Sequence, residues 1–414
     1  NHSFSFTPSP ACHFSMNISS TFRRFHAHTL TAKRSFYFQP VSSPFSRRPV
    51  HVRFYSQRSV GILGLPNIGK SALFNAAVKA ERALSANYPF ATIKANEATI
   101  SVPDERLELL AQGANCKRVV PAQLKLWDIA GLVRNASKGE GLGSQFLEDV
   151  RQASALVHLV RCHDAEHVVH VEASVDPVRD VKIIENELML SDFDFLDKTK
   201  QRLEKKHKKL SPQEKHALDL VKHVYNALLE EKFDELAKNH LELKKFGYNL
   251  LSTKPVLFVC NVNEHDFAND NSGENKWTQE LREYLQTTRS THLQMSLSAQ
   301  IEAECALLPP EDQGEILSEY GLTESRIPKM IRDAFDLLHV ITYFTVGEEE
   351  TRAWLTKSGS TAPQAAGVIH SDMENGFIKA DRTNWKDYLA CKCSDGEAKR
   401  MGKLTAESKN YIVQ

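Results

Sequence analysis

One octapeptide, GLPNIGKS at residues 64–71, constrains the fold of this chain more than any other feature. It fits the pattern G-x-x-x-x-G-K-[ST]. The apolar run Ser59–Leu63 precedes it and the helix-forming stretch Ala72–Lys79 follows it, the context in which this pattern forms a phosphate-binding loop. Its glycines allow successive backbone amides to point at phosphate oxygens, and the start of the helix adds partial positive charge. We therefore expect an α/β domain with Lys70 on the β- and γ-phosphates and Ser71 on Mg²⁺.

A second element, DIAGL at residues 128–132, follows the predicted strand Gln123–Trp127. Asp128 at the end of a strand suits a ligand of Mg²⁺-bound water, and the amide of Gly131 can sense a γ-phosphate. Ras-like GTPases place a glutamine, which orients the attacking water, directly after this glycine. Leu132 cannot form a hydrogen bond through its side chain. Another group must therefore position the water, or hydrolysis is slow.

A third element should recognise the base. Typical GTPases end a strand with Asn-Lys-x-Asp, whose aspartate accepts hydrogen bonds from guanine. Here the strand Pro255–Cys260 leads into NVNE at residues 261–264, so Glu264 is one methylene longer and Val262 replaces the lysine. A mismatched acceptor loses discrimination, which argues against strict guanine specificity. Strand Thr291–Met295 then leads into SLSA at 296–299, which resembles a loop that closes over the base.

The order of the remaining segments predicts the architecture. Apolar strands alternate with helical stretches, including the strand Ala155–Arg161, which indicates a doubly wound, mainly parallel α/β sheet over 59–337. Residues from about 195 to 250 interrupt this order with apolar side chains three and four residues apart, after a capping-box start at Ser211. We expect an inserted helical hairpin there. A β-like run opens a separate, β-rich domain at 338–414.

The N-terminal segment differs in composition from the rest of the chain. Lys plus Arg and Asp plus Glu each total 52, yet residues 1–58 contain no acidic residue. A basic, serine-rich and acid-poor segment is typical of an organelle transit peptide, and RFYS at residues 53–56 resembles a mitochondrial processing site. We expect mitochondrial targeting; the alternatives are the chloroplast, or the cytoplasm if this is not a transit peptide. Apolar runs of about 18 residues are absent from the sequence, so we expect no membrane partner.

These elements, in this order, resemble the Obg-like ATPase family, the YchF branch of the P-loop proteins related to translation factors. The resemblance covers roughly residues 59–414. The segments NYPFATI at 87–93 and DIAGLVRNASKGEGLG at 128–143 resemble the two switches of that family, and NVNE resembles its N-x-x-E variant, which is linked there to ATP preference. Residues 342–380 resemble its C-terminal TGS domain, a β-grasp-like module.

The resemblance implies a set of site residues. The phosphates would be held by Asn67, Ile68, Gly69, Lys70, Ser71 and Ala72. Mg²⁺ would be held by Ser71, Thr92 and Asp128. The base would be held by Asn261, Val262, Glu264 and Ser298. Asn67 also matches a position that binds K⁺ in related enzymes. His170 matches a histidine proposed to assist hydrolysis in place of the glutamine, since imidazole can orient or deprotonate water; it would act together with Lys70 and Gly131.

Together these features predict a slow, Mg²⁺-dependent ATPase that acts as a molecular switch and binds ATP more tightly than GTP. The resemblance implies the ribosome or the translation machinery as partner, and we expect a monomer. Two alternatives stay open: a GTPase of the same fold, and a nucleotide-gated scaffold for RNA or the ribosome with negligible turnover. The chain ends at Gln414, earlier than the family usually does, so we expect the TGS sheet to lack its closing strand and to leave an exposed edge.

Overall fold

The chain forms two compact units in the computed structural model. The residues that the structure describes are 12–15, 59–84, 93–94, 96–131, 142–164, 172, 174–206, 210–267, 271–290 and 292–414. An α/β unit contains residues 59–103 and 123–338. A C-terminal unit combines residues 339–414 with residues 104–122 and the strand at 12–15.

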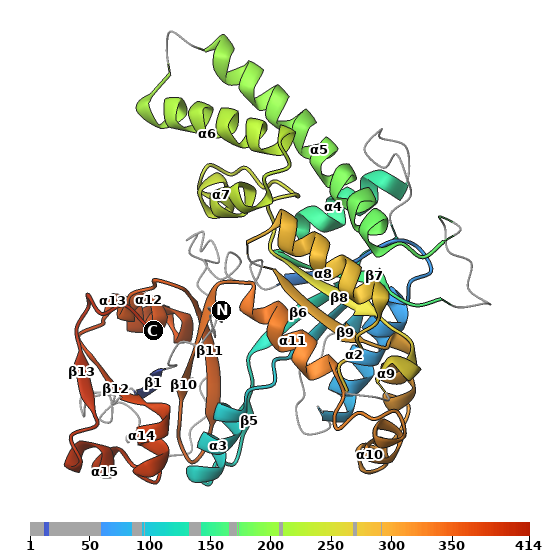
Figure 1. Ribbon diagram of the computed structural model, residues 1–414. Helices are drawn as coiled ribbons and strands as arrows, with labels where there is room; N and C mark the ends of the chain where they lie inside the picture. The colour runs from blue at the N-terminus through green and yellow to red at the C-terminus, as the bar shows by residue number, and fades with distance from the viewer. Residues whose placement is uncertain are drawn as a thin grey trace, which may run out of the picture. The chain divides into compact units, whose positions relative to one another are not determined.

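A seven-stranded sheet forms the centre of the α/β unit (Figure 1). Its strands, in spatial order, are β3 (Ile93–Lys94), β4 (Glu97–Ser101), β6 (Gln123–Asp128), β2 (Ser59–Leu63), β7 (Ala155–Arg161), β8 (Val256–Asn261) and β9 (Leu293–Leu297). Strand β4 runs antiparallel to its two neighbours, and all other pairs are parallel. This confirms the predicted doubly wound, mainly parallel fold. The central strands β2 and β7 are buried along their whole length, as expected when helices cover both faces.

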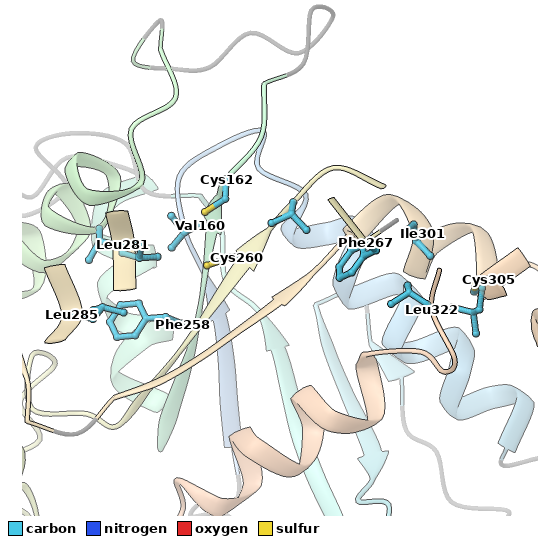
Figure 2. Close-up of a cluster of buried hydrophobic side chains, with 13 residues drawn as sticks. Val160, Cys162, Phe258, Cys260, Phe267, Leu281, Leu285, Ile301, Cys305 and Leu322 are labelled. Atoms are coloured by element: carbon cyan, nitrogen blue, oxygen red, sulfur yellow. The ribbon is translucent and has the colours of Figure 1, made fainter. Parts of the chain in front are cut away.

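Helices pack on this sheet and close its core. They are α2 (Lys70–Leu84), α4 (Leu142–Gln152), α8 (Lys276–Thr288), α9 (Ala299–Cys305), α10 (Pro310–Glu319) and α11 (Ile327–Asp336). One buried cluster joins β7 and β8 to α8 and α9, and Figure 2 shows its side chains, with Phe258 beside Leu285 and Phe267 beside Ile301. Cys162 and Cys260 are free thiols in this cluster.

The predicted helical insertion lies between β7 and β8 and forms an arm of three helices (Figure 1). They are α5 (Pro177–Lys205), α6 (Pro212–Leu229) and α7 (Phe233–Lys245). The capping box at the start of α6 is present: Ser211 Oγ accepts from the amide of Glu214, whose carboxylate accepts from the amide of Ser211. Helix α5 begins earlier than the expected hairpin, because Asp176 caps it and Pro177 occupies its first turn. None of the helices in the described ranges combines the length and apolar character that a membrane crossing requires.

The C-terminal unit is built on a six-stranded sheet. Its strands, in spatial order, are β13 (Thr405–Glu407), β12 (Ala380–Asn384), β1 (Cys12–Ser15), β10 (Val340–Thr345), β11 (Thr351–Lys357) and β5 (Val119–Val120). Its helices are α3 (Glu105–Gly113), α12 (Ala362–Ile369), α13 (Ser371–Asn375), α14 (Trp385–Ala390) and α15 (Asp395–Arg400). Strand β1 pairs with both β10 and β12. A strand from the other end of the sequence therefore occupies the interior of this sheet, and β13 and β5 form its two edges.

Residues 104–122 join the C-terminal unit although they lie between β4 and β6 in the sequence. The amide of Thr351 donates to the carbonyl of Arg118, and the amide of Lys117 donates to that of Glu348, each at 2.9 Å. The guanidinium of Arg106 lies 5.2 Å from the ring centroid of Phe344. Backbone pairing and packing therefore both hold α3 and β5 to this sheet, an association that no pattern in the sequence predicted.

The core of the α/β unit makes a prediction about acid stability. His158 on β7 is 4% exposed, and burial, helped by the positive charges of Arg289 and Lys70, lowers its pKa to about 3. The unfolded chain binds this proton near pH ~6.5, whereas the folded chain binds it only near its lowered pKa. Between these values the free energy of unfolding should fall by up to about 1.4 kcal/mol per pH unit as the pH decreases.

Urea unfolding at about pH 7 and about pH 5 measures this effect. His158→Leu should flatten the pH dependence, and the exposed His265→Leu should leave it unchanged. Equal slopes for the parent chain and His158→Leu would contradict the assignment.

Candidate nucleotide-binding site

The carboxyl ends of parallel strands meet at one edge of the α/β sheet. Ile62 of β2 lies opposite Asp128 of β6, and Asn261 of β8 lies opposite Leu297 of β9. The loop after β2, the acid ending β6, the asparagine ending β8 and the turn at Ser298 therefore share this edge. In open α/β sheets this is the edge where ligands bind.

The loop after β2 has the backbone angles of a phosphate-binding loop. Asn67 and Gly69 have φ values of 61° and 95°, and an asparagine adopts such a left-handed conformation more readily than most residues. A Cβ at Gly69 would also lie 3.0 Å from Nδ2 of Asn261, so a side chain there would crowd Asn261 as well as strain the backbone. Helix α2 then begins at Lys70, which leaves the amides of its first turn at this edge.

Lys70 lies inside this loop and is 7% exposed. Its Nζ donates to the carbonyl oxygen of Leu65 at 2.7 Å. Burial lowers its pKa to about 8, and the carboxylate of Asp128 opposes part of that shift. A Cβ at Gly131 would lie 3.1 Å from Nζ, so Gly131 passes close to the ammonium group. The structure thus brings together the lysine and the glycine that the sequence assigned to the γ-phosphate.

Ser71 and Asp128 supply the oxygens for a cation. Ser71 Oγ donates to Asp128 Oδ2 at 2.7 Å, although the two residues are far apart in the sequence. Hydroxyl and carboxylate oxygens are ligands that Mg²⁺ accepts, and Mg²⁺ commonly takes few protein ligands and completes its shell with phosphate and water. Across the described ranges no cluster of three or more His, Cys, Asp or Glu could hold a metal by itself. This pair therefore fits a magnesium ion that is bound together with a nucleotide.

Asn261 connects two loops of the site and is 6% exposed. Its Nδ2 donates to the carbonyl of Ile68 at 3.0 Å, and its Oδ1 accepts from the amide of Ala299 at 2.9 Å. One side chain thereby fixes the phosphate loop to the start of α9. Asn261 shapes the site through these two contacts, a role that the residue pattern alone did not reveal.

The other residues predicted to bind the base lie on the turn after β8 and on the turn between β9 and α9. Val262 is buried, and its amide donates to the carbonyl of Leu297 at 2.9 Å. Glu264 is half-buried and opens the 3-10 helix η5 (Glu264–Phe267). Ser298 caps α9, because its hydroxyl accepts from the amide of Ile301. Of these, Glu264 is the one with a charged group at this edge of the sheet.

Asp266 is a structural residue of the base turn that sequence reasoning missed. Its Oδ2 accepts from the amide of Asn263 at 3.0 Å and from Nδ2 of Asn275 at 2.9 Å. These bonds close the NVNE turn on itself and attach it to the start of α8. An acid three residues after an asparagine was the available signal. Two further predicted residues, the metal ligand Thr92 and the catalytic His170, lie outside the described residues, as does Leu132.

Two family profiles match the chain. Residues 59–187 match one described as a 50S ribosome-binding GTPase, and residues 340–414 match the C-terminal domain of YchF-type GTPases, which is described as a protein of unknown function. The chain is 41% identical over 357 residues to the ribosome-binding ATPase YchF of Haemophilus ducreyi, which covers 86% of this chain and 96% of that protein. The chain belongs to the YchF family of Obg-like ATPases. This confirms the resemblance drawn from the motifs.

Other YchF-family proteins agree over nearly the same span. Obg-like ATPase 1 of Caenorhabditis elegans is 36% identical over 387 residues, covering 91% of this chain and 94% of its own. The solved structure of the Schizosaccharomyces pombe YchF GTPase matches with a TM-score of 0.74 at 33% identity, covering 86% of this chain and 96% of that one. The likeness therefore extends through the arm and the C-terminal unit as well as the phosphate loop.

The lowered pKa of Lys70 predicts that nucleotide binding takes up a proton. Above pH ~8 the Lys70 amine of the free protein is largely neutral. Bound phosphate favours its charged ammonium form, so nucleotide binding must take up a proton from the buffer. Affinity should therefore decrease by up to about tenfold per pH unit above that value. Titration calorimetry at about pH 9 in two buffers of different ionisation enthalpy measures the uptake; at about pH 6.5 it should vanish. Equal uptake at both pH values would contradict this role of Lys70.

Proposed function

We propose that this chain is a Mg²⁺-dependent ATPase that works as a nucleotide switch on the ribosome. The observation that carries the proposal is the approach of Lys70, Gly131, Ser71 and Asp128 at one edge of the sheet. Family membership supports the hydrolase activity, and the names of the YchF relatives, which call them ribosome-binding ATPases, support the partner.

The residues divide the work of binding and activating a triphosphate. The amides of the phosphate loop and the start of α2 would hold the phosphates, and Lys70 would neutralise their charge. Ser71 and Asp128 would hold Mg²⁺, which neutralises charge that develops during phosphoryl transfer. Gly131, next to Lys70, would report whether a γ-phosphate is present. With leucine after it instead of glutamine, intrinsic turnover would be slow.

The base turn favours ATP. Glu264 replaces the aspartate, and Val262 replaces the lysine, of the guanine-specific pattern. Val262 has no charged stem to pack on the base; it is buried, and its amide donates to the carbonyl of Leu297 on β9. GTP would bind more weakly. A GTPase of the same fold remains the second candidate, because one matching profile and the S. pombe structure carry that name.

Finer features of the proposal come from the sequence. Asn67, exposed in its left-handed conformation, would contribute to a K⁺ site, and the protein would act as a monomer. Residues 1–58 would direct the chain to mitochondria, with cleavage near Ser56, which would also remove β1 from the C-terminal sheet. Sequencing the N-terminus of the protein recovered from mitochondria tests this, and an intact N-terminus would exclude cleavage.

Relative affinity for ATP and GTP tests the base-site argument. We expect the parent chain to bind ATP at least about tenfold more tightly, a difference of about 1.4 kcal/mol. Glu264→Asp should shift the ratio toward GTP, because the shorter carboxylate suits guanine. His265→Asn, on the exposed neighbour of Glu264, is the matched control. Tighter GTP binding by the parent chain would replace the ATPase proposal with the GTPase.

Single-turnover hydrolysis with and without ribosomes tests the switch itself. We expect slow hydrolysis by the free protein, faster hydrolysis with ribosomes, and loss of both in Lys70→Met, because this variant lacks the ammonium group that stabilises the negative charge of the transferred phosphoryl group. Tight ATP binding without turnover in either condition would instead identify a nucleotide-gated scaffold.

A further inference from the structure

The C-terminal end of α4 is held by side chains that come from outside the helix. The last carbonyl groups of a helix lack partners within it. The carbonyl oxygen of Arg151 accepts from Lys254 Nζ at 3.1 Å and from Asn249 Nδ2 at 2.8 Å. The carbonyl oxygen of Ala153, just past the helix, also accepts from Lys254 Nζ. The chain that returns from the arm to β8 therefore supplies the donors on which α4 ends.

Lys254 is an unusual helix cap because only 5% of it is exposed. Burial lowers its pKa to about 7, an effect that Lys244 and Arg151 strengthen and Asp192 opposes. The dipole of α4 favours a cation at this end. Its contacts with the two carbonyls, and with Oδ1 of Asn249 at 3.4 Å, give the group three oxygen neighbours. Removing the donor from such a buried site leaves the carbonyl groups unsatisfied.

The same short stretch also holds the arm; we call residues Asn249–Lys254 the junction segment. Asp192 of α5 is fully buried and accepts from the amides of Leu251, at 2.9 Å, and Ser252, at 2.8 Å. The hydroxyl of Ser252 adds a third bond, at 2.6 Å. The junction segment is thus bonded to the end of α4 on one side and to α5, the longest helix of the arm, on the other.

In the sequence, α4 follows the segment whose Gly131 we propose to sense the γ-phosphate. Residues 128–143 begin with Asp128 and Gly131 at the phosphate edge and run into the first turn of α4. The far end of that helix is bonded to the junction segment. A helix moves largely as a rigid element, so a displacement imposed at its start reaches the contacts at its end.

We propose that Lys254 is a positioning residue that couples the nucleotide state sensed at Gly131 to the helical arm, by fixing the end of α4 to the junction segment. The proposal rests on the switch function proposed above. In this proposal α4 takes a different position in each nucleotide state, and the orientation of α5 changes with it. A partner that binds the arm would therefore be bound differently in the two nucleotide states.

Hydrogen exchange of the full chain tests this coupling. Samples with the diphosphate and with a non-hydrolysable triphosphate analogue are compared, using whichever of the adenine and guanine nucleotides binds more tightly. With this choice the test also holds if the protein binds GTP more tightly than ATP. In the parent chain the amides of Leu251 and Ser252, and those of α5 around Asp192, should exchange at least about threefold more slowly with one nucleotide than with the other.

Lys254→Met keeps the length of the side chain and removes its donors. The difference between the two nucleotides should vanish at the junction segment and α5, while nucleotide affinity stays within about threefold, because Lys254 does not line the phosphate site. Lys238→Met removes an exposed lysine of the arm and should preserve the difference. A purely structural cap would instead lower the protection equally in both nucleotide states.

The proposal is overturned if the parent chain shows no difference between the nucleotides at these amides, or if Lys254→Met retains it. Should Lys254→Met fail to fold, Asn249→Ala decides the question, since it removes one of the two donors to the carbonyl of Arg151. That variant must show a reduced difference; a difference equal to that of the parent chain rejects the coupling.

Discussion

The parallel pairing of β2 with β6 and of β8 with β9 is the constraint on which the site depends. Because Ile62 faces Asp128 in that register, the hydroxyl of Ser71 reaches a carboxylate that is distant in the sequence. The pairing of β8 with β9 likewise places Asn261 beside the start of α9. A slip of one residue would turn Asp128 to the other face of the sheet. Strands β2 and β7 are buried along their whole length, so such a slip would also displace their buried side chains.

Buried polar side chains then convert this register into fixed loops. Asn261 uses its amide to hold the phosphate loop and α9 together, and Asp192 uses its carboxylate to hold the junction segment to the arm. Each is nearly or fully buried, so each bond forms without competition from water. In the α/β unit, a few buried polar side chains with satisfied hydrogen bonds therefore fix the phosphate loop and the helical arm in place.

The phosphate loop, the central strands and the capping box of α6 could be predicted because their signals are local. Strands β2 and β7 begin and end where the pattern placed them, whereas β8 extends to the polar Asn261, which pairs in the sheet and so escaped a search for apolar runs. Contacts between distant segments left no local trace. The partner of Asn261 on the phosphate loop and the partner of Lys254 on α4 depend on the tertiary fold. Glu97–Ser101 is short and alternates in burial, so it did not stand out as a strand.

The pairing of Thr351 with Val119 has a consequence for the order of events during synthesis. Strand β5 leaves the ribosome long before β11, and all of the helical arm is made between them. Contacts so distant in the sequence form late, because a long loop must close first. The C-terminal unit is therefore expected to complete its sheet after the α/β unit has acquired its core. Until then β5 has no partner strand. A fragment that begins at β10 lacks strand β5. Its sheet would therefore differ from the sheet of the C-terminal unit in the intact chain.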